Sequence, residues 1–151
     1  MKLTIVLIDP KIPQNTGNIG RMVAAYDCTL HIVGEVGFDL DDKQVRRAGL
    51  DYWQYLDWEY FPDTDAYLQR VFAEKRCFLL SSKVEKSYYD VKFQDDDHVI
   101  FGSETEGLPK PLLAANPDLC FTIPMPNSNI RSLNLSNCVA MVVAQAYEPR
   151  A

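Results

Sequence analysis

Residues 123–147 read IPMPNSNIRSLNLSNCVAMVVAQAY, and the rest of the chain is organised around them. The stretch begins at an apolar strand end and passes Pro124 and Pro126 into a polar loop. Ser and Asn side chains cap free backbone N–H groups, so the run from Asn134 to Asn137 predicts a helix start. Such a start also offers N–H groups to a polar or anionic ligand. We therefore expect a ligand-binding loop that leads into a helix.

The helix that follows is apolar on every face from Cys138 to Ala144. A surface helix normally has one apolar stripe, and its other faces are polar. A chain of 151 residues has difficulty covering such a helix alone. We expect a second subunit to cover it, which predicts a homodimer through the C-terminal helix.

Length and composition indicate one folded domain. The chain has 151 residues, of which 47% are apolar and 24% charged, as in globular proteins and unlike disordered ones. No apolar run is long enough to span a membrane. The apolar run after Lys2 is too short for a signal peptide, so the expected location is cytoplasmic.

Charge and cysteine content limit the classes of function. The net charge of −6 argues against a broad nucleic-acid-binding surface, but it leaves room for a local basic patch. The four cysteines lie far apart and the chain has only two histidines, so no metal site is expected. The cysteines are interpreted as small buried hydrophobic residues: Cys28, Cys77, Cys120 and Cys138.

Short apolar runs alternate with helical patterns, which predicts an α/β fold with a mostly parallel sheet and helices on both faces. The expected strands are residues 3–8, 29–33, 77–81, 99–103 and 119–123, with an extended segment at 52–58. Helices are expected at 18–26, between Asp41 and Gly49, at 63–75, from Pro109 and after Asn137. Ligands of such sheets bind at the carboxyl ends of strands, here the loops after Leu80, Phe101 and Ile123.

Two motifs precede helices. The first, NTGNIGR at 15–21, resembles a glycine-rich phosphate loop, with Glu35 near the place of a dinucleotide-binding acid. The third glycine is missing, so we expect a capped helix and no nicotinamide site. Arg21 is expected in the first turns of this helix, where a cation opposes the macrodipole, which suggests that it binds an anion. The second motif, VIFGSETEGLP at 99–109, is by itself consistent with an ordinary strand–turn–helix link.

Together, four segments resemble the SPOUT superfamily of S-adenosylmethionine-dependent RNA methyltransferases. They are IPQNTGNIGR (12–21), DDKQVRRAGLDYW (41–53), FGSETEGLP (101–109) and the stretch 123–137 with its RSLNLSN. The chain is most similar to the small TrmL-type tRNA 2′-O-methyltransferases, which modify the ribose of the wobble nucleotide. The resemblance implies a single methyltransferase domain over 1–151, a C-terminal trefoil knot and a homodimer.

The resemblance also assigns residues. Arg21 matches the family's catalytic arginine, and no metal is required. The positions matching or adjoining the family's donor contacts are Leu80, Gly102, Gly107, Ile123, Met125, Ser132 and Leu133. The candidates for RNA contact are Arg46, Arg47 and Arg131. For Arg46 and Arg47, a solvated surface face is an equal alternative.

The chemistry leaves two roles open for Arg21. A guanidinium has a pKa above ~12 and is a poor base, so it can bind the adjacent phosphate and orient the ribose hydroxyl, or it can abstract the proton directly. The alternatives to the wobble ribose are a ribose of another RNA, either ribosomal RNA or another tRNA position, and a non-catalytic RNA-binding module on the same fold.

Overall fold

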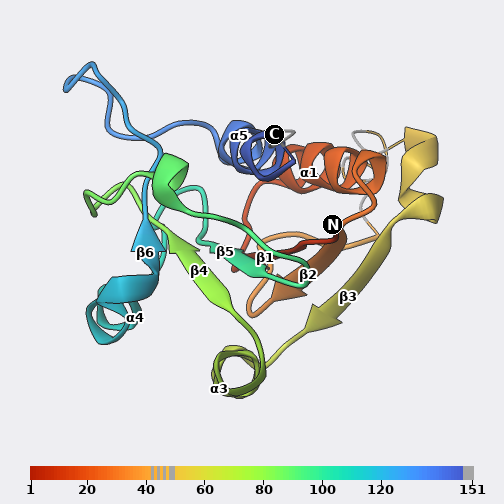
Figure 1. Ribbon diagram of the computed structural model, residues 1–151. Coiled ribbons are helices and arrows are strands. Elements are labelled where there is room, and N and C mark those ends of the chain that lie inside the picture. The colour runs from red at the N-terminus through yellow and green to blue at the C-terminus, as the bar shows by residue number, and fades with distance from the viewer. Residues whose placement is uncertain (42, 44, 46, 48–49, 148–151) are drawn as a thin grey trace.

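The computed structural model describes residues 1–41, 43, 45, 47 and 50–147. Its centre is a six-stranded sheet of order β3-β2-β1-β5-β4-β6, in which every neighbouring pair is parallel (Figure 1). The strands are β1 (Thr4–Ile8), β2 (Thr29–Val33), β3 (Asp57–Phe61), β4 (Cys77–Leu80), β5 (His98–Phe101) and β6 (Cys120–Phe121). The prediction of a mostly parallel α/β sheet is confirmed.

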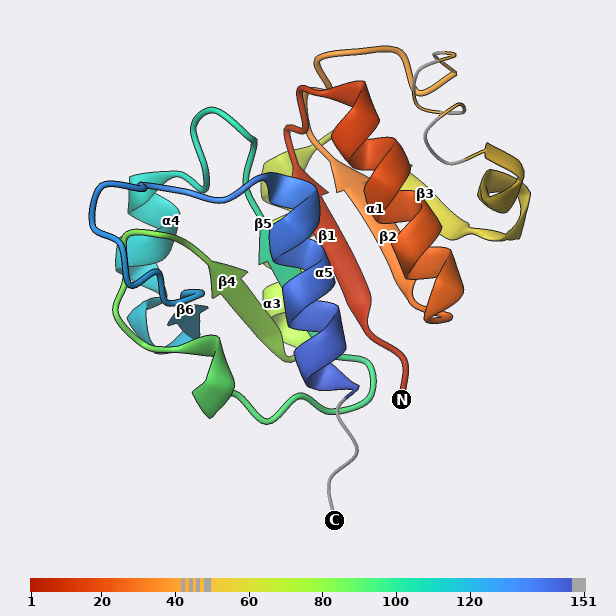
Figure 2. The same cartoon turned by 90° about the horizontal axis from the view of Figure 1, so that it is seen from above.

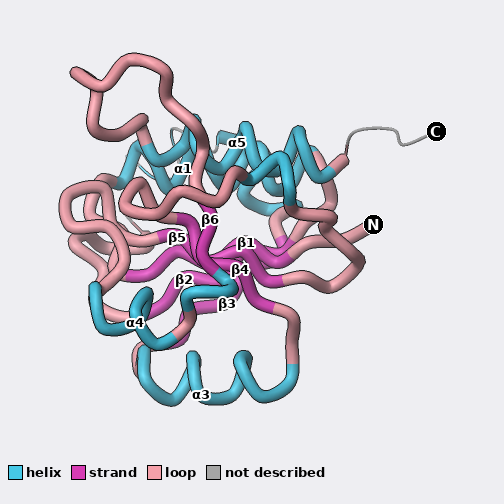
Figure 3. The backbone as a smooth tube through the Cα atoms, turned by 60° about the vertical axis from the view of Figure 1, so that its left-hand side comes forward, coloured by secondary structure: helices cyan, strands magenta, loops and turns pink. Residues whose placement is uncertain are grey.

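Helices cover both faces of the sheet, as predicted. On one face α1 (Pro13–Ala25) and α5 (Leu135–Ala146) lie side by side (Figure 2). On the other lie α3 (Thr64–Glu74) and α4 (Lys110–Ala115), so the molecule has three layers (Figure 3). Along β1, Ile5 and Leu7 join the core under α1 and α5, and Val6 and Ile8 join the core beside α3 and α4. Because both faces are covered, β1 is buried along its whole length and is apolar from Ile5 to Ile8. None of the described helices is long and apolar enough to cross a membrane.

The first helix begins five residues earlier than predicted, at Pro13 and not at Asn18. Proline fits the first helical position because its fixed φ suits the helix and its missing N–H would have no helical partner there. Arg21 therefore lies in the second half of α1, so the expectation of a cation in the first turn is wrong. The macrodipole argument for an anion partner does not apply to Arg21.

The aromatic segment 52–58 is not one extended strand. Residues Leu50–Tyr55 form a 3₁₀ helix, η1, and β3 begins at Asp57. The helix predicted between Asp41 and Gly49 lies largely outside the described residues, although Lys43, Val45 and Arg47 are helical. The helix predicted from Asp63 is confirmed, because the Asp63 carboxylate accepts a hydrogen bond from the Ala66 N–H at 3.1 Å and caps α3.

Candidate functional site

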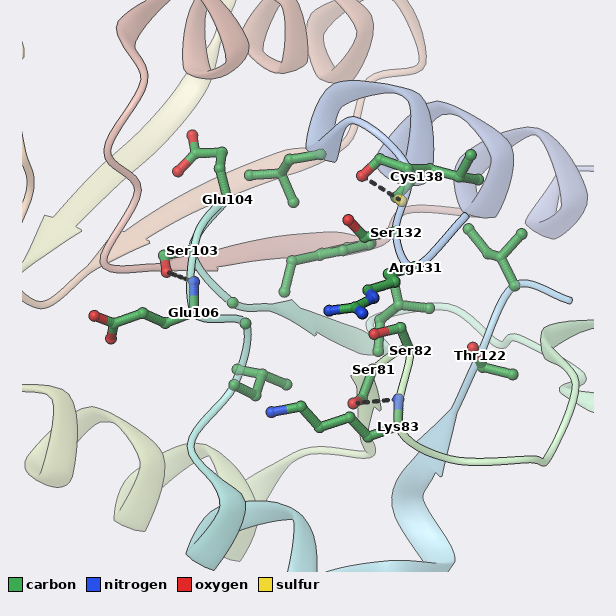
Figure 4. Close-up of a pocket in the computed structure, with 18 of the residues that line it drawn as sticks. Ser81, Ser82, Lys83, Ser103, Glu104, Glu106, Thr122, Arg131, Ser132 and Cys138 are labelled. Atoms are coloured by element: carbon green, nitrogen blue, oxygen red, sulfur yellow. Dashed lines mark hydrogen bonds between the residues drawn. The ribbon is translucent and has the colours of Figure 1, made fainter. Parts of the chain in front are cut away.

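A cavity of about 500 Å³ opens at the carboxyl ends of β4, β5 and β6 (Figure 4). The three loops that were expected to meet there, after Leu80, Phe101 and Ile123, all contribute to its walls. All seven residues expected to contact the methyl donor line it: Leu80, Gly102, Gly107, Ile123, Met125, Ser132 and Leu133. The structure therefore brings together residues that are up to 53 positions apart in the sequence, from Leu80 to Leu133.

The wall after β5 depends on two glycines with different roles. A Cβ on Gly102 would lie 2.1 Å from the carbonyl carbon of Gly107, so no other residue fits without moving the backbone. Gly107 has a φ of +68°, which favours glycine, and a Cβ there would meet no atom within 4 Å. The loop is closed by a hydrogen bond from the Gly107 N–H to the Ser103 carbonyl at 3.0 Å. Main chain, and not side chain, thus shapes this wall.

The rest of the lining combines apolar walls with a few polar groups. The apolar surface comes from residues such as Leu80, Ile123 and Leu135, and the hydroxyl groups come from Ser81, Ser82, Ser103, Thr122 and Ser132. Arg131 and Lys83 add two exposed cationic side chains to the lining (Figure 4). Volume and lining both suit a nucleoside-sized ligand held by apolar contacts and backbone groups.

Three of the four cysteines are buried, as predicted, and the fourth, Cys138, is half-buried. Cys138 begins the second turn of α5 and lines the cavity. Burial raises the pKa of its thiol, which keeps the group neutral near pH 7. The described residues contain no cluster of His, Cys, Asp and Glu that could hold a metal ion.

Glu104 links the cavity loop to both helices of one face. Its carboxylate accepts hydrogen bonds from the backbone N–H groups of Lys11 at 2.8 Å and Ile12 at 3.1 Å. Ile12 is the N-cap residue of α1 and Lys11 precedes it, and no side chain of the helix start caps α1. Asn15 donates from its side chain to Glu104 at 3.4 Å and accepts from Asn134 at 3.1 Å. Asn134 caps α5, so one hydrogen-bonded chain joins the cavity loop, α1 and α5.

The sequence motifs contained Glu104, Asn15 and Asn134 but did not reveal this network. Asn134 was recognised as a helix cap, which is a local signal. Glu104 acts on amides that lie 93 residues away at Lys11, and no local pattern reports a cap supplied from such a distance. The cavity is also lined by Ser82, Lys83 and Leu135, which were not named from the sequence. Ser82 and Lys83 belong to the loop after Leu80, which was expected to contribute to the wall.

The structure does not place Arg21 at the cavity of its own chain. Arg21 is absent from the cavity lining, and its guanidinium carbon lies 4.7 Å from the ring centroid of Tyr52 in η1. Since η1 precedes β3, this contact lies toward the sheet edge opposite β6. Of the candidate RNA contacts, Arg131 lines the cavity, Arg47 is exposed, and Arg46 is outside the described residues.

Comparisons with known proteins identify the family and the fold. A tRNA (cytidine(34)-2'-O)-methyltransferase of Saccharophagus degradans is 43% identical over 95% of this chain and 92% of its own length. A structure reported as "Structural insights into the 2-OH methylation of C/U34 on tRNA" is 39% identical, with a TM-score of 0.90 over 97% of this chain and 94% of that one.

The SpoU methyltransferase AviRb of Streptomyces viridochromogenes, in complex with the cofactor AdoMet, shares the fold at 23% identity. Its TM-score is 0.80 over 95% of this chain and 56% of that one. The SpoU rRNA Methylase family matches residues 2–144. With nearly its whole length matched, this chain belongs to the SpoU methylase family.

Proposed function

We propose that this protein is an S-adenosylmethionine-dependent tRNA 2′-O-methyltransferase that acts on the ribose of nucleotide 34, a cytidine or uridine. The observation that carries the proposal is similarity along almost the whole chain, at 39–43% identity, to proteins described with this activity. In this proposal residues 1–151 act as one methyltransferase domain. A tRNA substrate is consistent with a cytoplasmic location.

The cavity at the ends of β4, β5 and β6 is the proposed donor site. S-adenosylmethionine, when bound, supplies an electrophilic methyl group on a positively charged sulfur. Gly102 and Gly107 let the main chain approach it closely, and Leu80, Ile123 and Leu133 offer apolar contact. Met125 and Ser132 complete the wall contributed by the stretch after β6.

The proposed acceptor is the 2′-hydroxyl of a ribose. Formation of the oxygen–methyl bond would break the bond from carbon to sulfur, leave the sulfur as a neutral thioether and release the hydroxyl proton to solvent water. Arg21 would bind the phosphate next to this ribose and orient the hydroxyl, since a guanidinium stays protonated near pH 7. Orientation alone can lower a barrier by about 7–11 kcal/mol in favourable cases.

The position of Arg21 supports a site shared between two subunits. Arg21 does not line the cavity of its own chain, so in the proposed homodimer it would complete the cavity of the partner. The surface that supports a dimer is the outer side of α5, where Ala140, Met141 and Ala144 are exposed, with Tyr26 at the end of α1 also exposed. These apolar side chains would be covered by a second copy of the chain.

Substrate contact is proposed for the anticodon stem-loop of tRNA. Arg131 at the cavity opening and the basic pair Arg46 and Arg47 would bind its phosphates. Because the chain has a net charge of −6, such contacts would be local and would lose strength quickly as salt rises.

The C-terminal trefoil knot is also part of the proposal. Its support is the path of the chain, which ends β6 at one edge of the sheet and returns over β4 and β5 to place α5 beside α1 (Figure 2). Pulled from both ends in an optical trap, a knotted chain would stop short of about 3.3–3.6 Å per residue, and an unknotted one would reach it.

The test of the catalytic assignment is Arg21→Ala. We expect calorimetry to give the wild-type affinity for S-adenosylmethionine, and methyl transfer to tRNA to be lost. Transfer at the wild-type rate would show that Arg21 is not catalytic.

Mass spectrometry of tRNA from a deletion strain tests the identity of the substrate, because loss of the 2′-O-methyl group at position 34 is expected. Loss at another RNA position would favour the alternative substrate.

Mixing two inactive variants tests the shared site. A heterodimer of Arg21→Ala with Gly102→Ala has one subunit with an intact cavity and a partner with an intact Arg21. Transfer should return in the mixture if Arg21 acts across the dimer. If both variants stay inactive together, Arg21 serves its own subunit.

A further inference from the structure

Two consecutive residues of α1 meet two consecutive aromatic residues of η1. Trp53 packs on Gly20, where a Cβ would lie only 2.7 Å from the Cζ3 atom of its ring. Tyr52 lies against Arg21, with the guanidinium carbon 4.7 Å from its ring centroid. The glycine therefore lets η1 approach α1 closely enough for the next pair to form.

Trp53 fixes η1 in place. Its side chain is half-buried and lies 5.4 Å, between ring centroids, from Trp58 at the start of β3. Tyr52 is different, because 43% of its surface remains exposed and it makes no comparable contact with the core. Trp53 therefore attaches η1 to α1 and β3, whereas the ring of Tyr52 is available for contact with Arg21.

The position of the guanidinium over the tyrosine ring suits an arginine that binds phosphate. Within the part of the chain that the structure describes, Arg21 makes no ion pair or hydrogen bond, and the tyrosine ring is its contact. A ring that contacts the face of the guanidinium would leave its five N–H donors, which lie in the plane, available to an anion. Ordering this long exposed side chain before the phosphate arrives would reduce the rotamer entropy that is lost on binding.

We propose that Tyr52 is a positioning residue that holds the Arg21 guanidinium flat against its ring and presents the N–H edge to the substrate phosphate. The inference rests on the proposed role of Arg21 in methyl transfer. It gives a function to the GLDYW part of the segment 41–53, which the family resemblance identified without a role.

The experiment compares Tyr52→Leu, Tyr52→Phe and Tyr55→Leu. Tyr52→Leu should lower kcat about threefold to tenfold, the range expected for a partly exposed cation–π contact, with an unchanged KM for S-adenosylmethionine. Tyr52→Phe keeps the ring and should restore wild-type kcat. Tyr55→Leu is the matched control, because Tyr55 is in the same 3₁₀ helix, is 75% exposed and is not in contact with Arg21.

Two further measurements separate positioning from folding. In ¹H–¹⁵N spectra, the ring of Tyr52 should shift the Arg21 Nε–H signal, and the shift should vanish in Tyr52→Leu and persist in Tyr52→Phe. In an Arg21→Ala background, where radiolabelled methyl transfer detects residual activity, Tyr52→Leu should cause no additional loss.

An equal loss in both backgrounds would overturn the inference, as would wild-type kcat in Tyr52→Leu when Arg21→Ala is inactive. The catalytic role proposed for Arg21 fails separately, if Arg21→Ala itself keeps the wild-type rate, and the proposed function fails if the wild-type protein transfers no methyl group to tRNA.

Discussion

The cavity and the Arg21–Tyr52 pair are built in opposite ways. The cavity wall after β5 is main chain against main chain, set by a glycine whose Cβ would lie 2.1 Å from the facing backbone. The Arg21–Tyr52 pair is one side chain on one exposed ring, at 4.7 Å. The cavity should therefore respond to added volume and little to charge, whereas the pair should respond to loss of a single ring.

The largest effect is expected from Gly102→Ala. The added methyl group must displace the backbone of Gly107, so affinity for S-adenosylmethionine should fall by about 100-fold, or about 3 kcal/mol. Calorimetry with the donor is the measurement. The comparison variant is Gly107→Ala, which should cost about 1 kcal/mol of stability through its positive φ and lower affinity less than Gly102→Ala does, because its methyl group displaces no protein atom. If Gly107→Ala lost as much affinity as Gly102→Ala, backbone crowding at Gly102 would not explain the loss.

The next effect concerns Glu104, which joins the two regions. Glu104→Gln should lower the free energy of unfolding by about 2 kcal/mol, because hydrogen bonds to a carboxylate contribute about 1.5–3 kcal/mol. Chemical denaturation measures it. Glu106→Gln removes an exposed carboxylate from the same loop and should stay within about 0.5 kcal/mol of wild type. If both variants were equally stable, the cap on α1 would be unimportant.

The far face of the sheet supplies a third region, independent of the first two. His31 on β2 lies 2.7 Å, through Nδ1, from the Tyr67 hydroxyl of α3. Burial, with smaller contributions from His98 and Arg70, lowers the pKa of His31 to about 4.

The unfolded chain, with a His pKa near ~6.5, binds more protons than the folded chain between these values, so stability should fall as pH drops. From pH 7 to pH 5 we expect a loss of about 1–2 kcal/mol, allowing for partial exposure of the ring. Urea denaturation at the two pH values measures the loss. His31→Gln should reduce the pH dependence of the free energy of unfolding. If that variant kept the wild-type pH dependence, the effect would come from other groups.

The smallest effect is expected at the arginines that are proposed to bind RNA. Arg47→Ala should weaken tRNA binding a few-fold and reduce the slope of affinity against salt by about 1, as for a single phosphate contact. Lys92→Ala carries the same charge change beside Arg76, at the amino ends of β4 and β5, away from the cavity. Filter binding across a salt series should show no change of slope for Lys92→Ala. If both variants changed the slope equally, the effect of Arg47→Ala would come from the change in net charge and not from a phosphate contact.

The sequence was most informative where the structure is local. Buried parallel strands are continuous apolar runs, so the strands at Thr4–Ile8 and Thr29–Val33 were recognised, and with them the loops that line the cavity. The early start of α1 and the 3₁₀ helix η1 were not. Contacts far along the chain contribute to both, from Glu104 to the start of α1 and from Gly20 to η1. For α1 there was also a local signal, Pro13 at the first helical position, which the prediction did not use. Because the predicted helix began too late, at Asn18, Arg21 was expected in its first turns and not in the second half of α1.

The hydrogen-bonded chain through Glu104, Asn15 and Asn134 has a consequence for how such sequences diverge. Each of the three residues belongs to a different motif, and each would leave a polar partner unsatisfied if it changed alone. In an alignment of relatives, we expect these three columns to be invariant together or to change together. The three motifs, which are separate along the chain, would then evolve together.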